Sequence, residues 1–278
     1  MFQKTNSFSK KLIIKKDKQM NAYDKKWSLN NESFQIRFTE ICKEFEIKKP
    51  ENVVFYSQQN EEKYVIQYLL NKKVTDGTFL EVGGCDGVLY NNTKTLEEHF
   101  GFKGILIEPQ RNFYKKLKQN RSNCECYNCA VSDSDVPYIE FMGEDAEGGI
   151  VDTLNTNIAG RKSGFSIFHP STWKLLFKDN KPYKVENRKM SDVLKKSKFD
   201  YIDFMFIDVE GGELGLLKSI DYSYPIFCIF IEAHSDQPEK NEVVRNYLIS
   251  KGFTFRERQE GNEVWLNHNY FRKHLFNI

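Results

Sequence analysis

The sequence predicts an α/β fold with a mostly parallel sheet, helices on both of its faces and an antiparallel hairpin at its C-terminal end. Three observations predict it. Short apolar runs alternate with segments of helical periodicity, which is the pattern of parallel strands joined by helices. The first run ends in a glycine-rich turn at residues 83–87. Two late runs, 253–255 and 264–266, flank the turn 259–262 and predict the hairpin.

The expected elements follow the chain in order. Apolar positions at helical spacing predict a helix over 32–47, which Pro50 ends, and a second helix over 58–72, with Ser57 as its candidate N-cap. The strands are expected near 78–82, 104–108, 125–131, 203–208 and 226–232, and the remaining helices near 93–100, 110–120, 213–219 and 239–251.

Composition sets the broad class and the domain limits. The chain has 278 residues, of which 40% are hydrophobic and 29% charged, as in ordinary globular proteins. No run of about 18 apolar residues exists, so we expect no membrane span. Residues 1–50 hold twelve Lys or Arg and six Asp or Glu, although the whole chain carries only +2. We interpret 1–50 as a basic, partly helical or disordered extension, rather than a contact for nucleic acid or membrane, and 51–278 as the functional domain.

Residues 142–190 interrupt the alternation of strands and helices. This stretch is rich in Gly, Ser, Asn and Lys, and it lies between the third and fourth expected strands. Because ligands of open α/β sheets bind beyond the carboxyl ends of the strands, we interpret it as a substrate-side insert. Its aromatic residues could line an acceptor site or form a small core of their own: Phe165, Phe168, Trp173 and Tyr183.

The six cysteines are expected to be reduced thiols of a cytoplasmic protein, since no export signal precedes them. Cys124, Cys126 and Cys129 are spaced closely enough to suggest zinc. However, they lack a second pair of ligands nearby and fall on an expected strand, so buried thiols are the better interpretation.

The first strand carries the most informative motif, an acid followed by two spaced glycines. Glu81, Gly83 and Gly87 give acidic-x-Gly-x-x-x-Gly, in which Cys85 replaces the second glycine of the dinucleotide-binding pattern. A carboxylate beside the turn suits a ligand with positive charge, and S-adenosyl-L-methionine carries an ammonium and a sulfonium. A tight turn without a ligand explains the motif equally well.

The second strand also ends in an acid, Glu108, which lies 27 residues after Glu81 and is followed by Pro109. Such an acid can accept hydrogen bonds from both hydroxyls of a ribose. A solvated acid at a strand end is common, but two acids around one glycine turn favour a nucleoside site.

An ordered set of segments resembles the FkbM family of S-adenosylmethionine-dependent methyltransferases. The segments are 56–62, 79–87, 91–93, 96–97, 101–104, 107–109, 130–132 and 206–211. The resemblance implies the class I methyltransferase fold, with a Rossmann-like sheet, and O-methylation, often of sugar or polyketide hydroxyls. The candidate cofactor-binding residues are Glu81, Gly83, Gly84, Asp86, Gly87, Asn92, Glu108, Pro109, Ala130, Val131 and Asp208.

The ends of the fourth and fifth strands supply the candidate catalytic residues Asp208, Glu210, Glu232 and His234. Methyl transfer to a hydroxyl requires that its proton be accepted, and histidine suits that task near neutral pH. His234, or the pair Asp208 and Glu232, could be the base or could anchor the substrate. A histidine that caps the strand end is nearly as good an interpretation. Asp208, Glu232 and His234 could also bind a cation, but the spacing does not demand one and we predict no metal.

Two other function classes stay open at this point. One is a nicotinamide-dependent sugar oxidoreductase or epimerase, and the other is a non-catalytic binding module on the same fold. The preferred hypothesis is an O-methyltransferase that acts on a hydroxyl of a sugar or other small polyol-like acceptor. We expect a small-molecule or glycan partner and no nucleic acid.

Overall fold

The computed structural model describes residues 32–70, 76–143, 148–153, 181–235 and 237–269. The chain divides into two compact units, Met1–Glu51 and Asn52–Ile278. In the first unit the structure describes residues 32–51, which include helix α3 (Glu32–Glu44); this helix lies within the one predicted over 32–47. A short 3-10 turn, Pro50–Asn52, follows at the boundary.

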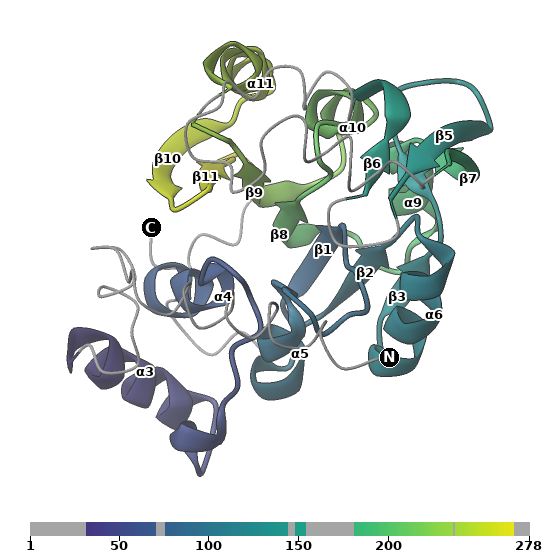
Figure 1. The fold of residues 1–278 in the computed structure, drawn as a ribbon. Helices are drawn as coiled ribbons and strands as arrows, with labels where there is room; N and C mark the ends of the chain where they lie inside the picture. Colours follow the sequence, from purple (N-terminus) through teal and green to yellow (C-terminus); the bar gives the residue numbers. More distant parts are fainter. Residues whose placement is uncertain (1–31, 71–75, 144–147, 154–180, 236, 270–278) are drawn as a thin grey trace, which may run out of the picture. The chain divides into compact units, whose positions relative to one another are not determined.

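The second unit is built on a seven-stranded sheet with the order β10-β11-β9-β8-β1-β2-β3 (Figure 1). The parallel strands are β1 (Thr78–Val82), β2 (Lys103–Ile107), β3 (Glu125–Tyr127), β8 (Ile202–Ile207) and β9 (Ile226–Glu232). The hairpin strands β10 (Thr254–Gln259) and β11 (Asn262–Leu266) are antiparallel, and β11 lies between β9 and β10. The predicted parallel sheet with a C-terminal hairpin is therefore confirmed.

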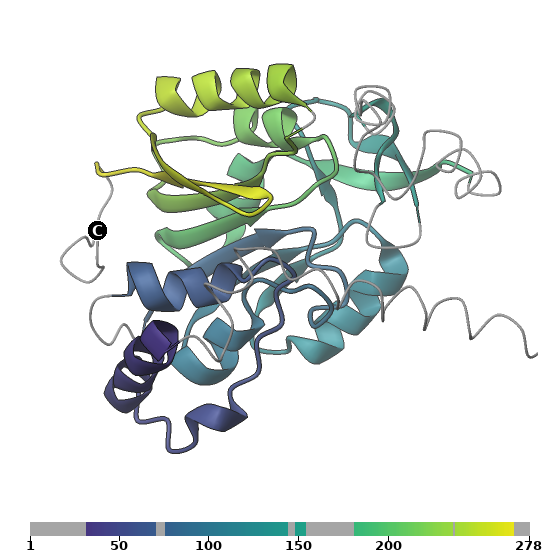
Figure 2. The ribbon, with the colours of Figure 1, turned by 60° about the vertical axis from the view of Figure 1, so that its left-hand side comes forward.

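Helices cover both faces of this sheet (Figure 2). Leu80 and Val82 of β1 point into an apolar cluster with Leu216 of α10 (Glu213–Lys218) and Leu248 of α11 (Pro238–Ser250). On the opposite face, Tyr64 of α4 (Glu61–Tyr64) packs edge-on against Phe230, at 5.9 Å between ring centres. The period-two geometry of each strand thus supplies side chains to both layers.

Two further predicted helices are present as α5 (Lys94–Phe100) and α6 (Arg111–Asn120). The helix predicted over 58–72 begins later, at Glu61, and continues as a π-helix over Val65–Leu69. Ser57 is not its N-cap. The backbone N–H groups of Tyr56 and Ser57 donate to the Glu62 carboxylate at 2.6 and 2.8 Å, so this side chain holds the preceding segment in a non-helical path.

A second, four-stranded sheet has the order β4-β7-β5-β6 and was not predicted. Its strands are β4 (Ala130–Val131), β5 (Tyr138–Met142), β6 (Gly149–Ile150) and β7 (Tyr183–Arg188), and helix α9 (Met190–Lys196) follows. The single strand predicted over 125–131 is wrong, because β3 ends at Tyr127 and 130–131 pair with β7 instead. Asn128 marks the break, since its side-chain amide donates to the carbonyls of Glu108 and Pro109 at 2.8 and 2.9 Å.

The predicted insert 142–190 is described only at its two ends, and Phe165, Phe168 and Trp173 lie outside the described residues. The longest described helices, α3 and α11, have 13 residues each, and none of the described helices has the length and apolar character needed to cross a membrane.

Candidate active site

A polar recess lies where strands β8 and β9 end. Ile207 of β8 is paired with Ile231 of β9, so the next residues along, Asp208 and Glu232, reach the sheet edge at the same level. Glu232 is in turn paired with Asn262 at the start of β11. The recess encloses about 390 Å³ including its open mouth, and its polar lining comes from Gln58, Gln59, Glu61, Tyr90, Asn92, Asp208, Glu232 and Asn262.

Carboxyl groups dominate the charge of this recess. Asp208 is exposed at the mouth of the recess. The protein atoms packed around its carboxyl and the repulsion from the nearby Glu232 and Glu210 raise the pKa of Asp208 above its usual range. Burial raises the pKa of Glu61 to about 8, although its carboxylate accepts hydrogen bonds from Asn262 Nδ2 at 2.7 Å and the backbone N–H of Gln59 at 3.1 Å. A positively charged ligand would relieve this repulsion.

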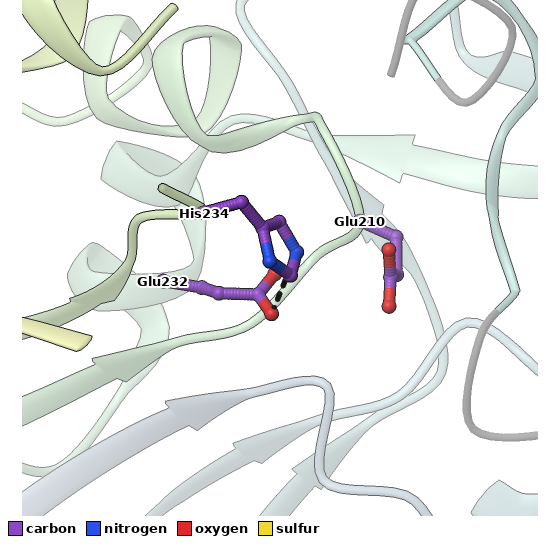
Figure 3. A group of neighbouring side chains, drawn as sticks. All are labelled: Glu210, Glu232 and His234. Carbon is purple, nitrogen blue, oxygen red and sulfur yellow. Dashed lines mark ion pairs between the residues drawn. The ribbon is translucent and has the colours of Figure 1, made fainter. Parts of the chain in front are cut away.

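Three of the predicted catalytic residues come together at the rim (Figure 3). His234 Nε2 lies 2.9 Å from Glu232 Oε1, and one ligand atom each of Glu210, Glu232 and His234 lies within 4.8 Å of the others. Glu210 occupies a left-handed backbone conformation (φ 50°) in the turn after β8. The structure thus places Glu210, rather than Asp208, in a group with Glu232 and His234.

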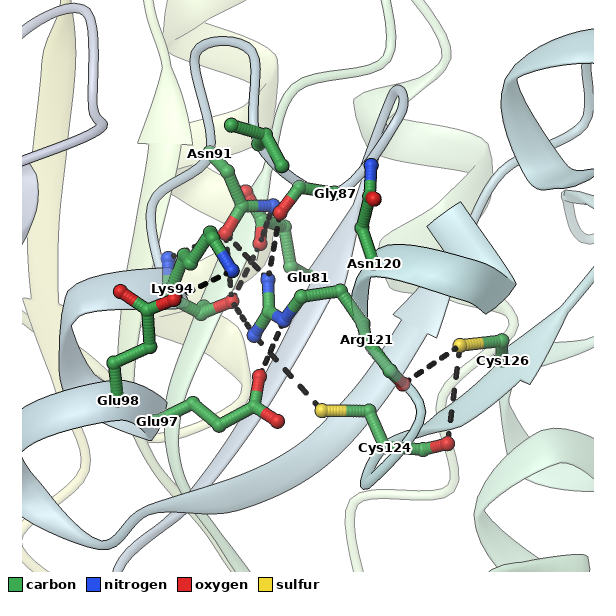
Figure 4. A network of polar contacts seen from close by, with 12 residues as sticks. Glu81, Gly87, Asn91, Lys94, Glu97, Glu98, Asn120, Arg121, Cys124 and Cys126 are labelled. Carbon is green, nitrogen blue, oxygen red and sulfur yellow. Dashed lines mark hydrogen bonds and ion pairs between the residues drawn. The ribbon is translucent and has the colours of Figure 1, made fainter. Parts of the chain in front are cut away.

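Glu81 lies under the site and is 1% exposed. Its carboxylate accepts hydrogen bonds from Asn91 Nδ2 at 2.8 Å, the backbone N–H of Asn92 at 2.8 Å and Thr93 Oγ1 at 2.7 Å (Figure 4). These three donors from the protein satisfy the hydrogen-bonding capacity that the Glu81 carboxylate uses in the folded chain. The Glu81 carboxylate thus holds the loop that carries Tyr90 and Asn92.

Arg121 completes this network from the end of α6, and it is also 1% exposed. Its guanidinium pairs with Glu97, donates to Asn91 Oδ1 at 2.6 Å and Thr93 Oγ1 at 3.0 Å, and lies 5.4 Å from the centre of the Phe79 ring. This positive charge opposes the effect of burial, which raises the pKa of Glu81. The two buried charges therefore support each other through the 91–93 loop.

The glycine turn is shaped by the protein itself. A Cβ at Gly83, where φ is +90°, would lie 2.2 Å from the carbonyl oxygen of Asp208. At Gly87, where φ is +80°, it would lie 2.7 Å from Arg121 Cγ, and at Gly84 it would lie 2.8 Å from Leu117 Cδ1. Asp86 turns inward on the same loop, where its carboxylate accepts the backbone N–H groups of Val88 and Leu89 at 3.0 and 2.8 Å. Packing within the chain thus suffices to explain the three glycines.

Glu108 lies at the end of β2, beside this turn, and is 2% exposed. Its two carboxylate oxygens accept the backbone N–H groups of Cys85 at 2.9 Å and Gln110 at 2.8 Å. Burial outweighs these two bonds and raises the pKa of Glu108 from 4.5 to about 8. A carboxylate oxygen can accept more than one hydrogen bond, so the group keeps the capacity to receive hydroxyls.

The remaining predicted cofactor residues lie away from the recess lining. The Pro109 carbonyl accepts the Asn128 amide, and Ala130 and Val131 are buried in the second sheet at 4% and 5% exposure. Ala130 and Val131 were expected at the end of the third strand, over 125–131. They belong to β4 of the second sheet instead.

All six cysteines are free. Burial raises the pKa of Cys124 to about 12 and that of Cys126 to about 11, and it raises the pKa of Cys129 to about 12. Metal coordination uses the thiolate, which burial disfavours here. Within the part of the chain that the structure describes, Glu210, Glu232 and His234 form the one group of three or more possible metal ligands.

Four site residues were missed in the sequence: Glu61, Tyr90, Arg121 and Asn262. Arg121 ends a helix and Asn262 opens a strand, where neither residue type is unusual. A signal did exist for Arg121. The segments that carry the family resemblance include the polar residues Asn91, Thr93 and Glu97, and polar side chains that become buried need a partner such as Arg121. For Asn262 only the pairing of β11 with β9 shows the proximity to Glu232.

The mostly parallel sheet with its C-terminal antiparallel hairpin has the architecture of class I methyltransferases. The sequence matches the methyltransferase FkbM domain over residues 81–256, which is more than half of the chain. The chain therefore belongs to the FkbM family of methyltransferases, and its methyl donor is S-adenosylmethionine. No curated protein sequence matches it.

Solved structures with a similar arrangement are remote in sequence. The METTL16 methyltransferase domain is 12% identical, with a TM-score of 0.40, and the match covers 94% of this chain and 90% of that one. Fibrillarin of Methanococcus jannaschii is 13% identical, with a TM-score of 0.35 and coverage of 73% and 71%. Aeropyrum pernix fibrillarin with bound S-adenosyl-L-methionine is 8% identical, with a TM-score of 0.37 and coverage of 70% and 66%. These structural similarities say nothing about the substrate of this chain.

Proposed function

We propose that this methyltransferase transfers the methyl group to a hydroxyl of a sugar or other small polyol-like acceptor. The observation that carries the proposal is the recess at the ends of β8 and β9, where amide and carboxyl side chains face one opening. Asn92, Asn262 and Gln58 can both donate to and accept from hydroxyls, and the carboxyls can accept. Tyr90, which is 48% exposed at the recess, adds an aromatic face.

The residues fit a positively charged donor. When bound, S-adenosylmethionine supplies an electrophilic methyl group on a sulfonium. Asp208 and Glu61 place two carboxyl groups in the recess lining, and a positively charged donor beside them would favour their ionised forms. We assign Glu108 to the ribose hydroxyls, because it ends the strand next to the glycine turn. Glu81, Asn91 and Arg121 position the loop between them.

The acceptor side is assigned to Asp208, Glu210, Glu232 and His234. The acceptor oxygen forms the new C–O bond as the sulfur–methyl bond breaks, the sulfur keeps the electron pair, and the hydroxyl proton must leave. His234, held by Glu232 at 2.9 Å, either takes up that proton or anchors the acceptor oxygen. Catalysis otherwise depends on positioning, which can contribute much of the rate in a two-substrate reaction.

The test is a transfer assay with methyl-labelled S-adenosylmethionine and a panel of sugars, glycosides, sugar nucleotides and glycans, beside phenols, amines and carboxylic acids. Label in a product that survives alkali shows an ether, whereas a methyl ester would hydrolyse. Transfer only to amines or carboxylic acids would overturn O-methylation of hydroxyls. Binding of S-adenosylhomocysteine without turnover on the whole panel would instead support a non-catalytic module.

The family membership sets aside the nicotinamide-dependent alternative. Cytoplasmic placement stays part of the proposal, supported by the six free cysteines.

A further inference from the structure

We propose that Glu210, Glu232 and His234 bind one divalent metal cation, which holds the acceptor oxygen. The cation site stands on its own geometry, and its role toward the acceptor rests on the proposed function.

The geometry is that of a cluster drawn from two strands. Glu232 and His234 come from the end of β9, and Glu210 comes from the turn after β8 (Figure 3). Their ligand atoms all lie within 4.8 Å of one another. Two ligands of one cation, each at about 2.1 Å from it, lie about 3 to 4.2 Å apart. Small side-chain movements therefore suffice to bring the three atoms into one coordination sphere.

The chemistry of the three side chains suits a cation. Carboxylates favour Mg²⁺ and Mn²⁺, and imidazole favours first-row transition metals, so a mixed set suits Mn²⁺ or a related divalent ion. Three protein ligands leave positions open for oxygens of water or substrate, as in catalytic metal sites. All three residues are half-buried, and Glu232 lines the recess. A hydroxyl that enters the recess can therefore reach the open positions.

The local charge points the same way. Glu210 and Glu232 each contribute a carboxylate oxygen to the cluster, and the carboxyl groups of Asp208 and Glu61 line the same recess as Glu232. An ion pair with one imidazole can compensate only one of these charges. The pairing of His234 with Glu232 accounts for the 2.9 Å contact, and a divalent cation would compensate the charges of Glu210 and Glu232 together.

A bound cation would give the reaction what a neutral hydroxyl lacks. An oxygen bound to a divalent cation loses its proton more readily, and the proton can pass to water in the open recess. His234 then acts as a ligand and not as the base. An acceptor with two neighbouring hydroxyls could bind through both, which agrees with a sugar.

The experiment measures Mn²⁺ binding to the full chain, freed of metal by a chelator, without cofactor or acceptor. Electron paramagnetic resonance counts the bound Mn²⁺, and electron spin-echo modulation detects nitrogen coupling from a coordinated imidazole. We expect one Mn²⁺ per chain with imidazole coupling. His234→Ala and His234→Asn should both abolish the coupling and weaken binding at least about tenfold. Glu232→Gln should weaken binding by a similar factor, with the imidazole coupling retained in whatever Mn²⁺ still binds.

Glu239→Gln is the matched control, because it removes one exposed carboxylate from the first turn of α11, close to His234 in sequence. It should leave Mn²⁺ affinity unchanged. Retained binding of S-adenosylhomocysteine shows that each variant is folded. Wild-type protein that binds no Mn²⁺, binds it without imidazole coupling, or binds it equally well after His234→Ala would overturn the cation site.

The same samples separate this inference from the proposed function. Binding of S-adenosylhomocysteine with no Mn²⁺ binding would refute the cation site alone. Mn²⁺ binding with imidazole coupling, but without methyl transfer to any hydroxyl acceptor in its presence, would keep the site and refute the proposed function.

Discussion

Glu81 and Glu108 end neighbouring strands, yet their surroundings give them different tasks. Glu81 is occupied by three donors of the 91–93 loop and lies near the Arg121 guanidinium. Glu108 accepts the backbone N–H groups of Cys85 and Gln110, and burial raises its pKa to about 8. We therefore propose that Glu81 positions a loop and that Glu108 is the residue whose charge a bound nucleoside senses.

Glu108 should make nucleoside binding depend on pH. Its pKa in the folded chain is about 8, so the protonated form dominates below that pH and the carboxylate above it. The carboxylate is the better acceptor for two ribose hydroxyls. We expect the affinity for 5′-methylthioadenosine, which has no group that titrates in this range, to rise from about pH 7 to about pH 9, as measured by calorimetry.

Glu108→Gln keeps the shape of the side chain and is the control for this pH effect. Its affinity should not change over the same range, whereas Glu108→Ala should lose about 1–3 kcal/mol of binding free energy at high pH. Since the folded pKa is raised, the stability that protonated Glu108 contributes is full below about pH 4.5 and is lost as pH rises through about 8. The Gln variant should lack that loss. Equal pH profiles for wild type and Glu108→Gln would remove Glu108 from the ribose site.

Arg121 should be the most costly charge to remove. Arg121→Met leaves Glu97 and Glu81 without their buried cation, which should lower the free energy of unfolding by about 3–5 kcal/mol in urea denaturation. Lys189→Met is the control, because Lys189 and Asp135 pair on the surface with side-chain exposures of 39% and 90%. That variant should stay within about 0.5 kcal/mol of wild type. Similar losses in the two variants would show that the Arg121 network does not support the fold.

At the scale of elements, the pairing of β1 with β8 fixes where along the strands the candidate active site lies. The pairs Val82 with Ile207 and Ile207 with Ile231 align β1, β8 and β9, so that Asp208 and Glu232 emerge together. Gly83 follows β1 directly and lets the Asp208 carbonyl approach. The turn glycine therefore matters because it fixes how two strands meet, whatever ligand binds above it.

Gly83→Ala and Gly252→Ala form a matched pair that isolates this contact. The two glycines have φ of +90° and +88°, but a Cβ at Gly252 meets its nearest atom, Asn269 Nδ2, at 3.5 Å instead of 2.2 Å. Gly252→Ala should cost about 1–2 kcal/mol, from backbone strain alone. Gly83→Ala should cost more, about 3 kcal/mol or above, because β1 and β8 must also separate. Thermal or urea unfolding measures both, and equal losses would mean that the Asp208 carbonyl is not a constraint.

For the whole molecule, family membership and fold predict that binding of the cofactor product stabilises the folded chain. A ligand that binds only the folded state stabilises it by about 2.7 kcal/mol at a concentration of 100 times Kd. For a chain of 278 residues this raises Tm by roughly 5–10 °C. S-adenosylhomocysteine should produce this shift in differential scanning calorimetry.

NAD at the same concentration is the control and should leave Tm unchanged, since the glycine turn has Cys85 where dinucleotide binders have glycine. Glu108→Ala should reduce the shift with S-adenosylhomocysteine, because it removes the acceptor assigned to the ribose. A shift with NAD and none with S-adenosylhomocysteine would contradict the assignment of the methyl donor.

The parts of the fold that could be predicted are the strands and helices whose residues show a clear local pattern of hydrophobicity. The runs at 78–82, 203–208 and 226–232 are continuous and apolar, because strands covered on both faces by helices must be, and they became β1, β8 and β9. The split at Asn128 could not be predicted in this way. It depends on an amide that bonds to two carbonyls 19 and 20 residues earlier in the chain.

The sequence by itself determined the α/β class, the family and the residues at the ends of β1, β2, β8 and β9, since these follow from hydrophobic period and from the order of short motifs. Only the tertiary structure decided which of those residues work together. It occupied Glu81 with its own loop, placed Glu210 beside Glu232 and His234, and brought Asn262 to the same edge. The physical reason is that strand pairing joins residues that lie far apart in the chain, and burial then sets the charge that each of them can carry.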